Sequence, residues 1–180
     1  DVIVQGKDTD EVFMSVVKTA WGITEENAFE NMDLLQYEVE ESPGMLTIRV
    51  LEPAKIVNMP GTIDFKMDIP INSNITFSTQ NGDLSAGNVK GTVDLDTSFG
   101  NVDIKDVQDG EVKAKTQNGN ITLRGINIKD YPIVAESAFG DINIFQVVAS
   151  SLNVSITNGR MNLENIMISG DINLSNDFGN

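Results

Sequence analysis

Residues 93–121 have the sequence VDLDTSFGNVDIKDVQDGEVKAKTQNGNI, in which one glycine follows Phe99 and another follows Asn118. Glycines preceded by Asn or Phe recur at intervals of 18 to 21 residues through the rest of the chain. The pairs are Asn81-Gly82, Phe99-Gly100, Asn118-Gly119, Phe139-Gly140, Asn158-Gly159 and Phe178-Gly179. A fixed period of about 20 residues is the signature of a solenoid, in which each repeat buries its apolar face against its neighbours.

Apolar residues hold fixed places after these glycines, and the residues between them are mostly polar. The columns are Leu84, Val102, Ile121, Ile142 and Met161, then Ala86, Ile104, Leu123, Ile144 and Leu163, and three residues further on Val89, Val107, Ile126, Val147 and Ile166. Similar columns precede each glycine, as at Val93 and Leu95. This alternation predicts two short strands per repeat, each with one face turned inward and a glycine turn between them.

The sequence therefore predicts an all-β fold. We expect a parallel β-solenoid (β-helix) of repeats of about 20 residues over residues 56–180, with a small N-terminal α+β cap over residues 1–55 packed on it. We treat the repeat region as one continuous structural unit. Stacked repeats with no helical period between them favour parallel sheets.

The predicted cap contains two hairpins and one helix. Residues 2–4 and 12–20 are rich in β-branched side chains and predict strands joined by a loop, although Asp10 could instead cap a helix over the second segment. Thr24 is placed to cap a helix that runs toward Leu35, and residues 42–44 (Ser-Pro-Gly) predict the turn of the second hairpin.

The sequence is compatible with two lengths for one coil of the solenoid. Asn and Phe alternate before successive glycines, so a coil of two repeats, about 40 residues, would form separate Asn and Phe ladders. A coil of one repeat would place both residue types in a single column. Only the short coil brings Asp94 and Asp96 beside Lys113 and Lys115 on the next rung, and we therefore favour it.

The composition excludes several classes of function. The 180 residues include no histidine and no cysteine, which removes Ser-His-Asp and Cys-His catalysis, thiolate nucleophiles and Fe–S clusters. The net charge of −15 repels the phosphates of nucleic acids. We expect no enzymatic activity, no cofactor and no nucleic-acid partner.

Outward carboxylates are the first candidates for a site. They are Asp83, Asp94, Asp96, Asp103 and Asp141. They could bind Ca²⁺ between rungs, but the Gly-Gly-x-Gly-x-Asp phrase of calcium-binding solenoids is absent, and we favour a solvated face without metal. Asp94 and Asp96 could form the acid pair of a glycoside hydrolase, except that Lys113 and Lys115 are expected to neutralise them.

Three phenylalanines are the second candidates. Phe99, Phe139 and Phe178 have the same parity as inward residues such as Leu95, so we expect a buried stack in the core. Stacking of sugar rings on exposed phenylalanines is the alternative interpretation.

The residues beside the turn complete the candidate site. Asn81, Asn118 and Asn158 are expected to form a ladder in which each side chain bonds its neighbour. Gly100 and Gly119 are expected to need a positive φ or close contact between rungs. No residue is assigned a catalytic, cofactor-binding or metal-binding role. The structural turn ladder consists of Asn81, Gly82, Phe99, Gly100, Asn118, Gly119, Phe139, Gly140, Asn158 and Gly159.

The repeat phrases at residues 79–84 (TQNGDL) and 116–121 (TQNGNI), alternating with SFGNV at 98–102 and AFGDI at 138–142, resemble a known family. This is the bacterial adhesin-like family of unknown function called the toastrack domain, a β-helical module of envelope proteins. The likeness covers the repeats from about residue 62 onward, and the head around Trp21 is also similar. The resemblance implies a periplasmic or cell-surface location in bacteria and brings no catalytic residues with it.

From the repeat, the missing catalytic residue types and this resemblance, we expect a non-enzymatic cell-envelope module for surface binding, assembly or envelope-stress sensing. A carbohydrate-binding or carbohydrate-active β-helix is the alternative. The partner is expected to be a protein or a surface glycan, with any membrane anchor outside these residues. An open solenoid end exposes unpaired strand edges, so we expect a monomer or weak end-to-end association.

Overall fold

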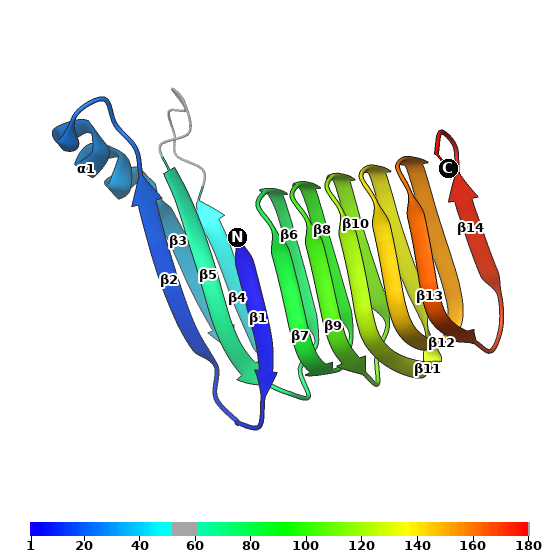
Figure 1. The fold of residues 1–180 in the computed structure, drawn as a ribbon. Helices are drawn as coiled ribbons and strands as arrows, with labels where there is room; N and C mark the ends of the chain where they lie inside the picture. The colour runs from blue at the N-terminus through cyan, green and yellow to red at the C-terminus, as the bar shows by residue number, and fades with distance from the viewer. Residues whose placement is uncertain (52–60, 180) are drawn as a thin grey trace. The chain divides into compact units, whose positions relative to one another are not determined.

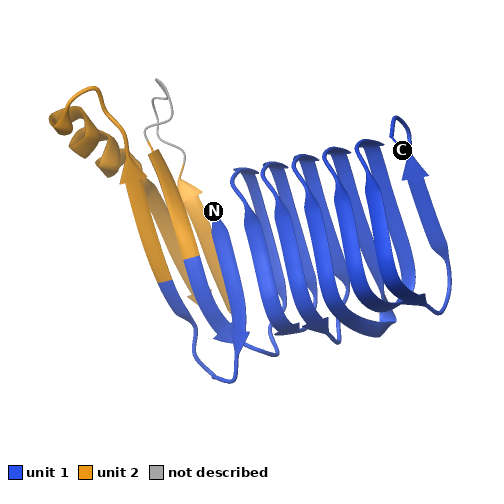
Figure 2. Cartoon of the chain, viewed as in Figure 1, with its two compact units in different colours: residues 1–14, 66–180 blue, residues 15–65 orange. Residues whose placement is uncertain are grey.

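The computed structural model describes residues 1–51 and 61–179. The chain forms two compact units, which Figure 2 colours separately. Residues 1–14 and 66–180 make up the first unit, and residues 15–65 make up the second.

The repeats in the first unit form two rows of stacked parallel strands (Figure 1). One row contains β7 (Leu84–Lys90), β9 (Val102–Gln108), the first halves of β11 (Ile121–Phe139) and β12 (Ile142–Asn158), and β13 (Met161–Ile168). The other row contains β6 (Ile75–Asn81), β8 (Val93–Phe99), β10 (Val112–Asn118), the second halves of β11 and β12, and β14 (Ile172–Asn176). Corresponding residues of successive repeats pair directly, as Val112 does with Val93 and Ile133. The predicted parallel β-solenoid is confirmed.

Each coil holds one repeat. Phe99 pairs with Asn81 on one side and with Asn118 on the other, and Phe139 pairs with Asn118 and Asn158. Asn and Phe therefore share one column that crosses successive rungs. The short coil is correct, and the coil of two repeats is excluded.

The core lies between the two rows and consists of the predicted inward columns. Ile121 and Leu123 are completely buried. The buried polar side chains among the described residues are Thr97, Thr116 and Ser137. Burial decreases in the last strands, where Leu174 of β14 is 50% exposed. β14 pairs with β12 and with no other strand in the part of the chain that the structure describes.

A left-handed residue interrupts every strand of the first row. These residues are Asn88 (φ +56°), Asp106 (φ +54°), Gly125 (φ +67°), Gln146 (φ +56°) and Asn165 (φ +56°). Asn, Asp and Gly tolerate this region better than other residues do. The left-handed residue adds one position to the strand. It explains why the third inward column follows the second by three positions, from Ala86 to Val89, although a regular strand has a period of two.

The N-terminal strand adds one more rung to the first row. β1 (Val2–Lys7) pairs in parallel with β7, and Val4 is buried opposite Ala86. The predicted hairpin between β1 and β2 (Phe13–Ala20) is wrong, because β5 (Gly61–Pro70) lies between them in the sheet order. Residues 6–10 therefore connect two strands that are not neighbours, which a local turn pattern does not reveal.

The second unit contains the predicted helix and the predicted second hairpin. Thr24 caps α1 (Glu25–Leu34), and β3 (Gln36–Ser42) pairs with β4 (Met45–Leu51) in an antiparallel hairpin. β2 is a strand, so the alternative of a helix over residues 11–20 is excluded. The predicted boundary after residue 55 lies outside the described residues. Within the described ranges, no helix has the length and apolarity needed to cross a membrane.

The buried column can be tested at Leu123. Leu123→Ala should lower the free energy of unfolding by about 2–5 kcal/mol, because the rungs above and below prevent the cavity from collapsing. Leu174→Ala is the matched control and should cost less, since Leu174 is already half exposed. Urea denaturation of both variants measures the difference, and equal losses would contradict the assigned core.

Candidate functional site

The chain turns between the two rows at one glycine in each repeat. We call Gly82, Gly100, Gly119, Gly140 and Gly159 the glycine corner. Gly119 N–H donates to Phe139 O at 2.9 Å, and the preceding corner glycines donate in the same way to the next rung. A Cβ added at Gly119 would collide with the carbonyl oxygen of Gly100, and the same collision recurs from Gly100 to Gly159. Close contact between rungs thus explains why the corner needs glycine.

Buried hydroxyls bond the inner side of the corner. Thr97 Oγ1 donates to Gly82 O at 3.1 Å, Thr116 Oγ1 donates to Gly100 O at 2.9 Å, and Ser137 Oγ donates to Gly119 O at 3.2 Å. These bonds satisfy hydroxyl groups that would be costly to bury without a partner. The buried polar column is therefore part of the turn.

A second ladder runs along the outer side, in the residue that follows each corner glycine. Asp83 Oδ1 accepts from Asn101 N at 2.6 Å, and Asn101 Oδ1 accepts from Asn120 N at 2.9 Å. Asn120 Oδ1 then accepts from Asp141 N at 2.8 Å. This outer ladder was not among the features predicted above, although its signal is visible in the sequence: an Asp or Asn follows each of the first four corner glycines.

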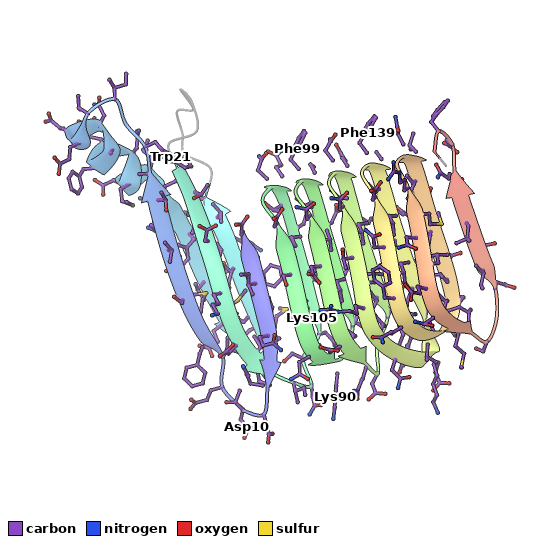
Figure 3. All side chains as sticks on the ribbon, in the orientation of Figure 1. Asp10, Trp21, Lys90, Phe99, Lys105 and Phe139 are labelled. Carbon is purple, nitrogen blue, oxygen red and sulfur yellow. The ribbon has the colours of Figure 1, made fainter. Side chains whose placement is uncertain are left out.

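The residue before each corner glycine is exposed. The column contains Asn81, Phe99, Asn118, Phe139 and Asn158, continues in sequence to Phe178, and is called here the Phe–Asn row. Phe99 is 55% exposed, Phe139 is 53% exposed and Phe178 is 74% exposed. Figure 3 shows Phe99 and Phe139 projecting from the same edge of the stacked strands.

The predicted buried phenylalanine stack is wrong. Inward alternation along β8 holds through Leu95 and Thr97 and then ends, because the chain begins to turn toward Gly100. The parity of Phe99 with Leu95 therefore does not place its ring in the core. The same break occurs after Ser137, where Phe139 is exposed.

The predicted asparagine ladder is also wrong in its contacts. Asn118 pairs with Phe99 and Phe139, so the nearest asparagines of the row, Asn81 and Asn158, are two rungs away. Within the described residues, no side-chain hydrogen bond involves these three amides. The ladder of amide and carboxylate bonds runs through the outer column instead.

The two aspartates considered as an acid pair lie beside lysines. Asp94 pairs with Lys113 and Asp96 pairs with Lys115 in the strand register. The ammonium groups of these lysines bond glutamates instead, Lys115 to Glu136 at 2.9 Å and Lys113 to Glu111 at 3.1 Å. The hydrogen bond to Glu136, with the charges of Glu136, Asp96 and Asp94, raises the pKa of Lys115 above its ordinary value. Among the described residues, no group of three carboxylates gathers where a metal ion could bind.

Comparison with known proteins identifies one family. The model of the Toastrack family, DUF4097, matches residues 24–180, which include the helix, the second hairpin and all the repeats. No curated protein and no solved structure matches the chain.

Gly119→Val tests the contact at the corner. It should lower the free energy of unfolding by about 1–3 kcal/mol, because the new side chain must displace the backbone of the neighbouring rung. Gln117→Val is the control, since Gln117 is exposed and β-branched residues suit a strand. Thermal melting measures both variants, and an unchanged melting temperature for Gly119→Val would refute the contact.

Asn120 tests the outer ladder. Asn120→Ala removes the oxygen that accepts from Asp141 N and should cost about 0.5–1.5 kcal/mol. Asn120→Asp keeps an acceptor at this place, as Asp83 does two rungs away, and should recover most of the loss. Chemical denaturation compares the two, and equal destabilisation would show that the ladder contributes nothing.

Proposed function

We propose that this chain, which belongs to the Toastrack family, is a non-enzymatic binding module of the bacterial cell envelope that makes contact through its Phe–Asn row. The observation that carries the proposal is the exposure of Phe99 and Phe139, each more than half exposed, on one edge of the solenoid. Aromatic side chains supply much of the contact energy at binding surfaces.

The support of the row by a rigid scaffold favours binding. Phe99 and Phe139 each precede a corner glycine whose backbone is bonded to the adjacent rungs. Gly100 O accepts a further bond from the buried Thr116 hydroxyl. A surface whose backbone is already ordered loses little conformational entropy when it binds. The row is therefore suited to a ligand that meets it without rearrangement.

A non-enzymatic role is favoured by the chemistry that the side chains offer. The chain has neither histidine nor cysteine, and the Asp94 and Asp96 pair stands beside two lysines. Two of the carboxylates at the corner, those of Asp83 and Asp141, accept backbone hydrogen bonds. These features suit a structural surface. A catalytic acid pair would instead need two carboxylates whose environments give them different pKa values.

The envelope assignment rests on the repeat phrases that resemble bacterial envelope modules, together with charge. The net charge of −15 disfavours nucleic acid as a partner. We therefore place the module outside the cytoplasm, at the cell surface or in the periplasm. There its partner would be a component of the envelope.

Co-sedimentation with washed bacterial cell-envelope fragments tests this function. The wild-type chain should sediment with the fragments, and Phe99→Ala/Phe139→Ala should remain in the supernatant because the row has lost its rings. Phe29→Ala is the matched control, since Phe29 on α1 is 66% exposed and lies outside the row. Failure of the wild type to sediment, or equal sedimentation of the double variant, would contradict the proposal.

A further inference from the structure

We infer that the Phe–Asn row binds an extended, uncharged, β-1,4-linked glycan chain that runs along the stacked strands. Phe99 and Phe139 would each stack on a pyranose ring, and Asn118 would bond the hydroxyls of the sugar between them. This inference rests on the proposed function and names the chemical class of the ligand at the same row.

The distance between Phe99 and Phe139 matches the repeat of a β-1,4-linked glycan. Neighbouring strands lie about 4.8 Å apart, so Phe99 and Phe139, two rungs apart, are separated by about 9.6 Å. In an extended β-1,4-linked glycan each sugar is turned over relative to the one before it. The same face of the sugar ring therefore points toward the protein once per disaccharide. The length of one disaccharide is comparable to a separation of two rungs. An extended peptide repeats its face after about 6.6–6.8 Å and falls out of step with the row.

The side chains of the Phe–Asn row also suit the chemistry of a sugar. The face of a phenylalanine ring is apolar and electron-rich, which suits the C–H groups on one face of a pyranose. Each amide in the row offers both N–H donors and a carbonyl acceptor, as the hydroxyls of a sugar do. Asn81, Asn118 and Asn158 are exposed and have no side-chain hydrogen bond among the described residues. Rings and amides thus alternate at the positions where sugar faces and sugar hydroxyls would alternate.

The negative charge of the protein favours an uncharged glycan over an anionic one. The outer ladder beside the row carries the carboxylates of Asp83 and Asp141, and the whole chain has a net charge of −15. A polyanionic chain would be repelled at low ionic strength. An uncharged glycan is not repelled, so its affinity should change little with salt.

A proline-rich peptide is the strongest competing ligand. A polyproline II helix advances about 9.3 Å per turn, which also suits the two-rung spacing. Proline has no backbone N–H, so such a peptide offers the amides of the row acceptors only. A glycan satisfies both the donor and the acceptor of Asn118. These features favour the glycan.

Isothermal titration with a β-1,4-linked N-acetylglucosamine hexasaccharide tests the inference. The wild-type chain should bind the hexasaccharide, bind the corresponding disaccharide much more weakly, and show similar affinity at low and high salt. Phe99→Ala and Phe139→Ala should each weaken binding roughly 3- to 10-fold. Phe29→Ala should leave the affinity unchanged. Circular dichroism melts of all variants establish that any loss of binding is not a loss of fold.

Several outcomes would overturn the glycan assignment. These are no binding of the hexasaccharide, equal binding of an α-1,4-linked glucose hexasaccharide, unchanged affinity in both row variants, or binding of a proline decapeptide in place of the sugar. If the hexasaccharide fails while envelope fragments still retain the wild type and not the double variant, the ligand class is wrong and the proposed function stands. If the fragments also fail to retain the wild type, both are refuted.

Discussion

The structure depends on backbone contact between glycines of successive rungs. A Cβ at Gly119 would overlap the carbonyl of Gly100, and the same limit applies at each neighbouring corner. Only glycine lets the chain turn there while the rungs remain at the spacing of strands in a sheet. Because this contact recurs in every repeat, it holds the repeats in one register. The inward columns, the hydroxyl bonds and the outer ladder all follow from that register.

The same contact determines which side chains the solenoid exposes along its edge. The residue before each corner glycine leaves the alternation of the strand, so its side chain projects from the edge and does not enter the core. One such residue comes from each rung, and the alternation of Asn118 with Phe99 and Phe139 sets the rings two rungs apart. In the function proposed here, binding would be a property of the repeat as a whole and not of a single pocket.

The sequence predicts those parts of the fold that depend on local patterns or on the register of the repeat. The inward position of Leu123, the rung pairing of Asp96 with Lys115 and the cap of α1 at Thr24 all follow from local alternation, charge or capping. Prediction failed where the alternation stops or where pairing is distant. The parity of Phe99 with Leu95 predicts a buried ring, but the inward alternation ends at Thr97, where the chain begins to turn. β5 separates β1 from β2 because it comes from much later in the chain.

Disulfide trapping tests the single-repeat coil and its corner column most directly, because the natural chain has no cysteine. Phe99→Cys/Asn118→Cys places two thiols on adjacent rungs, about 4.8 Å apart at Cα, within the range of about 4.4–6.8 Å that a disulfide needs. Phe99→Cys/Phe139→Cys places them about 9.6 Å apart, beyond that range. We predict rapid intramolecular oxidation of the first pair and none of the second. Oxidation of the second pair but not the first would contradict the stacking on which the whole account rests.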